Sequence, residues 1–100
     1  MSMDTIEKNA FDSYIREGDW HISLGETREN SHYYNDARDH YYKAKEKYDT
    51  AFNIARYADD QNGEIEADNK SRLADDLYRS ISRKEWEYNQ KQKENDCNEQ

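Results

Sequence analysis

Two histidines and an aspartate stand four residues apart in the sequence, at His32, Asp36 and His40. On one α-helix this spacing points the three side chains the same way. Imidazole and carboxylate groups are ligands of zinc, and His21 could supply a fourth from an earlier segment. Spacings of four also arise by chance in so polar a chain. We therefore expect no metal site and no cofactor.

The sequence offers little else that could catalyse a reaction. It contains no glycine-rich phosphate loop and no nucleophile elbow. The single cysteine, Cys97, lies in a polar stretch where no buried site could activate its thiol. It also has no cysteine partner within the chain, which suits a reducing cytoplasm. We expect a protein that is not an enzyme and that is cytoplasmic.

Acidic side chains are in excess and are unevenly spread. The chain has 23 acids against 15 bases, a formal net charge of −8. Residues 59–68 contain acids but no base, and two more acids follow within the next two turns. One interpretation is a docking patch for a basic partner, and the other is a solvated helix surface with intrahelical ion pairs. The candidate contact residues are Asp59, Asp60, Glu64, Glu66, Asp68, Asp75 and Asp76.

The acidic balance argues against direct nucleic-acid binding, which requires a basic face. Imitation of DNA is the sharper possibility. Duplex DNA carries roughly 30 phosphates over 50 Å of axis, more than all the acids of this chain. A mimic would therefore need its bases segregated from its acids. Some segregation is visible, because bases gather late in the chain, at Arg79, Arg83, Lys84, Lys91 and Lys93.

The nine tyrosines are the remaining chemical signal. Tyrosine and tryptophan are favoured binding anchors, because they bury a large area at low entropic cost. We expect Tyr34, Tyr41 and Tyr48 to replace the scarce leucines in the core. The remaining candidates for a partner-binding surface are Tyr33, Tyr42, Tyr57 and Trp86.

The composition predicts that helices carry all these residues. There is no proline or valine and only three glycines, which favours helix over strand. Thirteen aromatic residues argue against disorder despite the high charge. No apolar run approaches the roughly 18 residues of a membrane span, and no apolar stretch resembles a secretory signal. We expect an all-α domain over residues 1–90 and a frayed or disordered polar tail over 91–100.

The first predicted helix is short. Asp4 is a good N-cap, and Glu7 stands three residues later, as in a capping box. Gly18 is the expected stop. The residues that would share its buried face are Ile6, Ala10, Phe11, Tyr14 and Ile15.

The second predicted helix is long, because no glycine or proline occurs between Glu26 and Asp60. Tyrosine and alanine recur there with a heptad period, which predicts a seam against another helix. Alanine lets that helix approach closely, while tyrosine packs its ring and keeps its hydroxyl wet or bonded. The seam positions are Tyr34, Tyr41, Tyr48 and Ala55, and Ala37, Ala44, Ala51 and Ala58.

Residues 59–63 have the composition of a turn. A third helix is expected after Gly63, antiparallel to the second, so the fold is a short N-terminal helix plus a long antiparallel helical hairpin in a small helical bundle. A second copy could complete the seam as a homodimer. The predicted apolar line of the third helix is Leu73, Leu77 and Ile81, with Ala67, Ala74, Tyr78 and Tyr88 beside it.

Residues 42–58 resemble part of a tetratricopeptide repeat. The positions that fit the spacing of that family's small and aromatic residues are Tyr42, Tyr48, Ala51, Phe52, Ala55 and Ala58. The resemblance implies helix-turn-helix units that present a groove to a peptide. Where the family has a small turn residue, this chain has Lys45-Glu46-Lys47, which predicts continuous helix.

The chain as a whole resembles a class of small acidic inhibitors encoded by phages and mobile elements, among them anti-restriction, anti-CRISPR and nuclease-inhibitor proteins. That resemblance implies a non-catalytic protein that occludes a protein partner, such as a basic nucleic-acid-processing enzyme, in some cases as a DNA mimic. The alternative is a helical scaffold or chaperone-like module that holds a peptide or a partner helix. Neither function involves a membrane.

Overall fold

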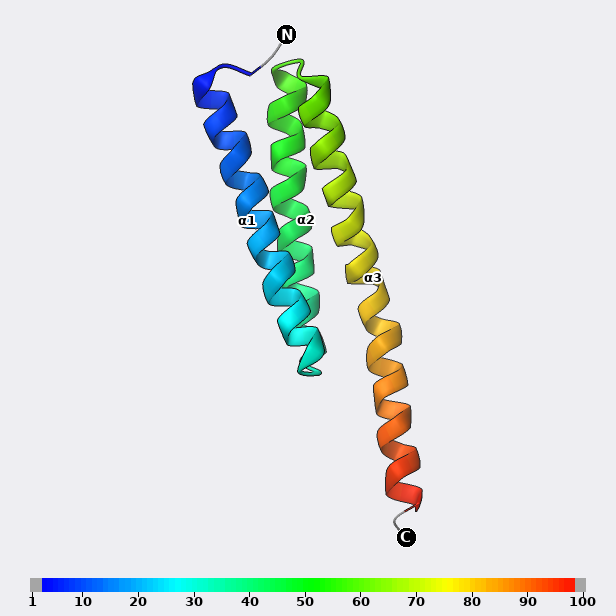
Figure 1. Ribbon diagram of the computed structural model, residues 1–100. Helices are drawn as coiled ribbons and strands as arrows, with labels where there is room; N and C mark the ends of the chain where they lie inside the picture. Colours follow the sequence, from blue (N-terminus) through cyan, green and yellow to red (C-terminus); the bar gives the residue numbers. More distant parts are fainter. Residues whose placement is uncertain (1–2, 99–100) are drawn as a thin grey trace.

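The computed structural model describes residues 3–98, with side chains as far as Asn95, and these residues form α1 (Thr5–Asn30), α2 (Tyr34–Tyr57) and α3 (Gln61–Asn98). The prediction of an all-α fold is confirmed. Consecutive helices run antiparallel, and α1 and α3 each pack along α2 while meeting each other at few points (Figure 1). The Cα atoms span 67 × 16 × 13 Å. None of the three described helices has the length and apolar character of a membrane span.

The predicted start of α1 is confirmed, and its predicted end is wrong. The Asp4 carboxylate accepts a hydrogen bond from the Glu7 amide at 2.8 Å, and the Glu7 carboxylate accepts one from the Asp4 amide at 3.0 Å. This capping box satisfies amides that the helix itself leaves free. The helix then continues through Gly18 and Gly25 for 26 residues. The N-terminal helix is therefore not short, and it is longer than α2.

A turn that was not predicted from the sequence separates α1 from α2. We expected one helix across residues 26–60, whereas the chain reverses at Ser31–Tyr33. His32 adopts a left-handed backbone with φ 66°, and the Tyr33 amide donates back to the Arg28 carbonyl at 2.9 Å. Histidine, asparagine and aspartate tolerate this conformation better than most residues. The turn therefore forms without a glycine.

The predicted turn between α2 and α3 lies slightly earlier than expected. Asp59 supplies the left-handed residue, with φ 58°, and α3 begins at Gln61. The Asp60 carboxylate accepts a hydrogen bond from the Gly63 amide at 3.0 Å, so it caps α3. Gly63 is buried inside the first turn of α3, where an added Cβ would lie 2.9 Å from the Ala55 Cβ. It allows a close approach of two helices and is not the turn residue.

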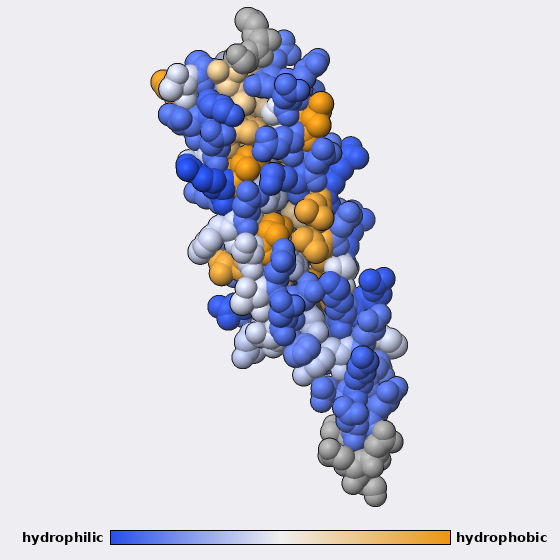
Figure 2. Space-filling view, viewed as in Figure 1, coloured by the Kyte–Doolittle hydropathy of each residue, from blue (hydrophilic) through white to orange (hydrophobic). Residues whose placement is uncertain are grey.

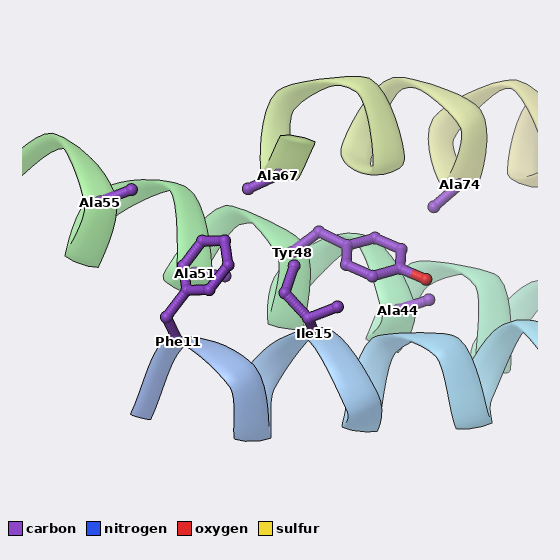
Figure 3. Packing of buried hydrophobic residues seen from close by; sticks show 8 residues of the cluster. All are labelled: Phe11, Ile15, Ala44, Tyr48, Ala51, Ala55, Ala67 and Ala74. Carbon is purple, nitrogen blue, oxygen red and sulfur yellow. The ribbon is translucent and has the colours of Figure 1, made fainter. Parts of the chain in front are cut away.

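The tyrosine and alanine seam of α2 is confirmed. Its positions from residue 34 to 55 are buried, and Ala58 follows as the helix C-cap. Figure 3 shows the ring of Tyr48 lying between α1 and α3, with Ala44 and Ala51 on the helix beside it. α2 also runs without a break through Lys45-Glu46-Lys47, as those residues predicted. The turn that a tetratricopeptide repeat would place there is not present.

Two glycines of α1 face the two most buried tyrosines of α2. An added Cβ on Gly18 would lie 2.3 Å from Cε1 of Tyr48, and one on Gly25 would lie 2.5 Å from Cε1 of Tyr41. Any side chain at either glycine would overlap a ring. Two of the three tyrosine rings of the seam therefore fit against the two glycines of α1, which explains why glycines stand inside a helix.

The predicted apolar line of α3 is confirmed at Ile81, and Ala67 and Ala74 beside it are buried as predicted, but the prediction for Leu73 is wrong. Leu73 is 55% exposed, whereas Ala67, Ser71, Ala74 and Ile81 are buried. The buried residues at positions 67, 74 and 81 are seven apart, like the alanines of α2, and two of the three are alanines. The prediction for Ile6 is also wrong, because this side chain points away from the buried face of α1.

The last part of α3 extends past the other two helices (Figure 1). Tyr88 still packs, since its ring stacks on His32 at 4.0 Å between centroids. Side chains 91–95 are exposed. The sequence predicted a frayed or disordered tail over 91–100, whereas α3 continues to Asn98. The side chain of Cys97 and residues 99–100 lie outside the described residues.

A candidate acidic docking surface

One end of the rod concentrates the negative charge. The start of α1 lies beside the α2–α3 turn (Figure 1), and Met3 and Phe11 both approach Gly63. We call residues 3–12 and 56–68 the acidic end. They contain eight acids and two bases, Lys8 and Arg56, so they carry −6 of the formal net charge of −8. The packing of α1 onto the hairpin thus adds Asp4, Glu7 and Asp12 to the predicted cluster.

Helix chemistry accounts for part of this cluster. Asp4, Glu7 and Asp60 are bound as caps. α1 and α3 both begin here, and the positive ends of their dipoles favour nearby carboxylates. A cap keeps its charge, however, and the outward oxygens still contribute to the local potential. Glu64 and Glu66 are neither caps nor members of an ion pair among the described side chains, and Glu66 is exposed.

Away from the acidic end, acids are mostly neutralised by neighbouring bases. Intrahelical pairs join Lys43 to Asp39 at 3.0 Å and Arg79 to Asp75 at 2.9 Å. Pairs between helices join Lys47 to Glu17 at 3.2 Å and Arg38 to Glu85 at 3.2 Å. Such exposed pairs contribute little stability. Their consequence for recognition is larger, because they leave the body of the rod with small net charge.

The structure brings only some of the predicted acidic residues together. Asp59, Asp60, Glu64 and Glu66 gather at the α2–α3 turn and the first turns of α3. Asp68 is close to them, but it pairs with Arg72 at 3.1 Å. Asp75 and Asp76 lie about two turns further along α3 and are separate from the acidic end.

The predicted aromatic contact residues are all exposed, and they lie in different places. Tyr33 is in the α1–α2 turn, and Tyr42 faces Tyr78 of α3 at 5.8 Å between ring centroids. Trp86 is on α3, towards the far end of the rod. Tyr57 alone stands at the acidic end. The surface in Figure 2 is accordingly hydrophilic with small, separate apolar patches.

The buried tyrosine hydroxyls hold two acids in fixed positions. Tyr48 donates to Asp19 at 2.6 Å, and Lys70 of α3 donates to the same carboxylate at 3.0 Å. Tyr41 donates to Glu29 at 2.9 Å, and Lys84 bridges to that carboxylate at 2.7 Å. Burial, followed by these acids, raises the pKa of both tyrosines, so both stay protonated donors.

The histidines do not form the set considered from their spacing. His32 lies in the turn before α2, where Nδ1 is 2.9 Å from the Tyr34 hydroxyl. His40 instead meets His21 of α1, with 3.0 Å between the Nδ1 atoms. Burial, then the charge of His40, lowers the pKa of His21. Within the residues described, no group of three or more His, Cys, Asp or Glu side chains is arranged to hold a metal.

One feature of the acidic end was predicted only in part, since Tyr57 was a candidate contact residue and Ile6 was assigned to the core. Ile6 and Tyr57 are exposed on neighbouring helices and flank a hollow of about 370 Å³ with an apolar lining. The spacing of Ile6, Ala10, Phe11, Tyr14 and Ile15 had placed Ile6 on the buried face. Its exposure follows from the full length of α1, which fixes the buried face on Phe11, Ile15 and Gly18 instead.

Comparisons with known proteins give no relative. No protein family matches the chain, and no curated protein or solved structure is similar to it. The functional argument therefore depends on the geometry and charge described above.

Proposed function

We propose that this chain is a non-catalytic binding protein whose acidic end docks onto a basic surface of a protein partner and occludes it. The observation that carries the proposal is the concentration of −6 of the net charge at one end of a rod 67 Å long. A localised charge of one sign steers a partner of the opposite sign and orients its approach.

The partner class follows from the same chemistry. Basic surfaces large enough to complement several carboxylates are typical of proteins that bind nucleic acids. Steric occlusion of such a surface would inhibit the partner without any catalytic step. The ion pairs along the rod weigh against mimicry of an extended duplex, because DNA presents its charge continuously along its axis. We therefore favour docking through the end of the rod.

A neutralised variant tests this. Asp59→Asn, Asp60→Asn, Glu64→Gln and Glu66→Gln together lower the net charge to −4, and asparagine at position 60 can still cap α3. The matched control removes four acids that lie away from the acidic end and form no ion pair with another described side chain: Glu26→Gln, Asp36→Asn, Glu46→Gln and Glu94→Gln. Both variants have equal net charge and differ only in where it was removed.

The measurement is capture of proteins from a cell lysate at low and high salt, followed by titration of the captured protein. The acidic-end variant should bind that protein at least about tenfold more weakly at low salt. Exposed ion pairs contribute up to about 1 kcal/mol each, and a loss of about 1.4 kcal/mol in binding free energy is a factor of ten. The control should retain most of the affinity, and binding by both proteins should weaken as salt rises. Equal loss in the two variants would show that net charge alone matters and would refute docking at this end.

A further inference from the structure

The acidic end also carries an apolar hollow. Ile6 of α1 is 81% exposed and Tyr57 of α2 is 89% exposed. Single exposed apolar residues are ordinary. These two stand on either side of one hollow of about 370 Å³, and Ala10 and Ile54 form part of its lining. We call this hollow, with Ile6, Ala10, Ile54 and Tyr57, the apolar notch.

The described chain does not cover the notch. Ile6 and Ala10 are four residues apart and lie on a different side of α1 from Phe11 and Ile15, which face α3 and the core. α3 approaches α2 at Ala55, through Gly63, and not at Tyr57. The notch is therefore the outer groove between α1 and α2, open to whatever docks at this end.

The surroundings of the notch are acidic. Glu7 lines it, and Asp4 stands just before Ile6 at the helix start. Asp59 and Asp60 follow Tyr57 closely, in the α2–α3 turn. An apolar hollow with one carboxylate in its lining, at the acidic end of the rod, is complementary to a bulky apolar side chain that is itself flanked by lysine or arginine.

We propose that the apolar notch receives the apolar face of a basic amphipathic helix of the partner. The volume is near the lower end of the roughly 300–1,000 Å³ of typical ligand pockets, which suits one or two large side chains. Helix-in-groove recognition uses such anchors at spacings of three and four residues. This inference rests on the proposed function. It adds an apolar contact that would fix the position of the partner helix on the acidic end once charge has attracted it.

Two peptides of identical composition separate the anchor from the charge. Both are 14-residue chains of leucine and lysine, one with its leucines on a single helical face and the other with the order scrambled. Binding is measured by titration calorimetry at low and high salt. The test variant is Ile6→Ser with Tyr57→Ser, and the matched control is Trp20→Ser with Leu73→Ser, two exposed apolar residues that do not line the notch.

The amphipathic peptide should bind the unmodified protein at least about tenfold more tightly than the scrambled peptide, because burial of one leucine is worth about that factor. The notch variant should lose this preference while still binding both peptides at low salt. The control variant should keep it. All four replaced residues are exposed, so the fold should persist in both variants. Circular dichroism melts of each variant check this.

The outcomes distinguish the two proposals. Equal binding of the two peptides, or a preference that survives in the notch variant, overturns the apolar anchor and leaves the acidic end standing. If the acidic-end variant and its matched charge control lose partner binding equally, the proposed function is overturned. Sedimentation of the protein alone adds one further outcome: a dimer abolished by Ile6→Ser and Tyr57→Ser would assign the notch to a second copy of the chain and refute a partner helix.

Discussion

Gly18→Ala is expected to destabilise the protein, although the same change normally stabilises a helix. Replacing glycine by alanine in a helix interior gains about 1 kcal/mol. Here the new methyl would lie 2.3 Å from Cε1 and 2.7 Å from Cδ1 of Tyr48. Carbon atoms in contact sit roughly 3.5–4.0 Å apart, so the ring or the helix must move by more than about 1 Å.

Neither can move without loss. Tyr48 is almost completely buried, and its hydroxyl is fixed by Asp19, which also binds Lys70. Overpacking a core costs about 1–3 kcal/mol, and a buried hydroxyl that loses its acceptor costs about 1–3 kcal/mol more. After subtraction of the helix gain of about 1 kcal/mol, the expected net destabilisation is about 1–5 kcal/mol, centred on about 3 kcal/mol. In a domain of this size, about 3 kcal/mol lowers the melting temperature by roughly 10–25 °C.

Urea denaturation followed by circular dichroism measures this change. Ser13→Ala, an exposed position of the same helix, is the matched control and should be neutral or slightly stabilising. In a Tyr48→Leu background the ring is gone, so Gly18→Ala should no longer destabilise, and the double-mutant cycle isolates the contact. A Gly18→Ala protein that is as stable as Ser13→Ala would refute close packing between α1 and the seam.

Three further predictions concern pH and chain length. Because burial raises the pKa of Tyr41 and Tyr48, the stability that they contribute is complete below pH 10.0 and falls above it. Denaturation between pH 9 and 11 should show a smaller decline in Tyr48→Phe. Burial and His40 lower the pKa of His21, so its contribution is complete above pH 6.5 and is lost as the pH falls below that value. Melts from pH 7.5 to 5 should show this loss, and His21→Asn should reduce it. Ending the chain after Asn89 should change the free energy of unfolding by less than about 0.5 kcal/mol, because side chains 91–95 are exposed, and a larger loss would show that they make contacts.

The features that the sequence predicted well are those with a strong local cause. Seven-residue recurrence of tyrosine and alanine identified the α2 seam, because only a packed helix face requires that period. The capping box at Asp4 and Glu7 was predicted because two side chains three residues apart satisfy two free amides. Both signals depend on neighbours in the chain and not on the tertiary fold.

The predictions that were wrong depended on contacts between helices. Gly18 was interpreted as a helix stop, which is glycine's usual local role, whereas its actual role is set by a tyrosine 30 positions away. The turn at His32 contains no glycine or proline, so composition could not reveal it. A signal was nevertheless present. Phe11, Gly18 and Gly25 are seven residues apart, the same period as the seam, and the two glycines face tyrosines of the seam.

The same distinction applies to the candidate site. Counting charges was enough to find the acids of residues 59–68. It could not show that α1 begins beside them, because that depends on how α1 packs against α2. The apolar notch could not be predicted either, since Ile6 becomes exposed only when the buried face of α1 is fixed by residues further along.

The packing of the core also explains why the end of the rod, and not its side, is the surface to test for binding. A seam of tyrosines needs an acceptor for each buried hydroxyl, and Asp19 and Glu29 fill that role under bridging lysines. Asp19 and Glu29 are already paired with lysines, and they cannot turn towards a partner without breaking their hydrogen bonds to the seam tyrosines. Among the described side chains, Glu64 and Glu66 hold no such hydrogen bond or ion pair. A partner that neutralises them gains electrostatic free energy without disturbing the fold, whereas one that binds the middle of the rod meets acids of which most are already paired with lysine or arginine.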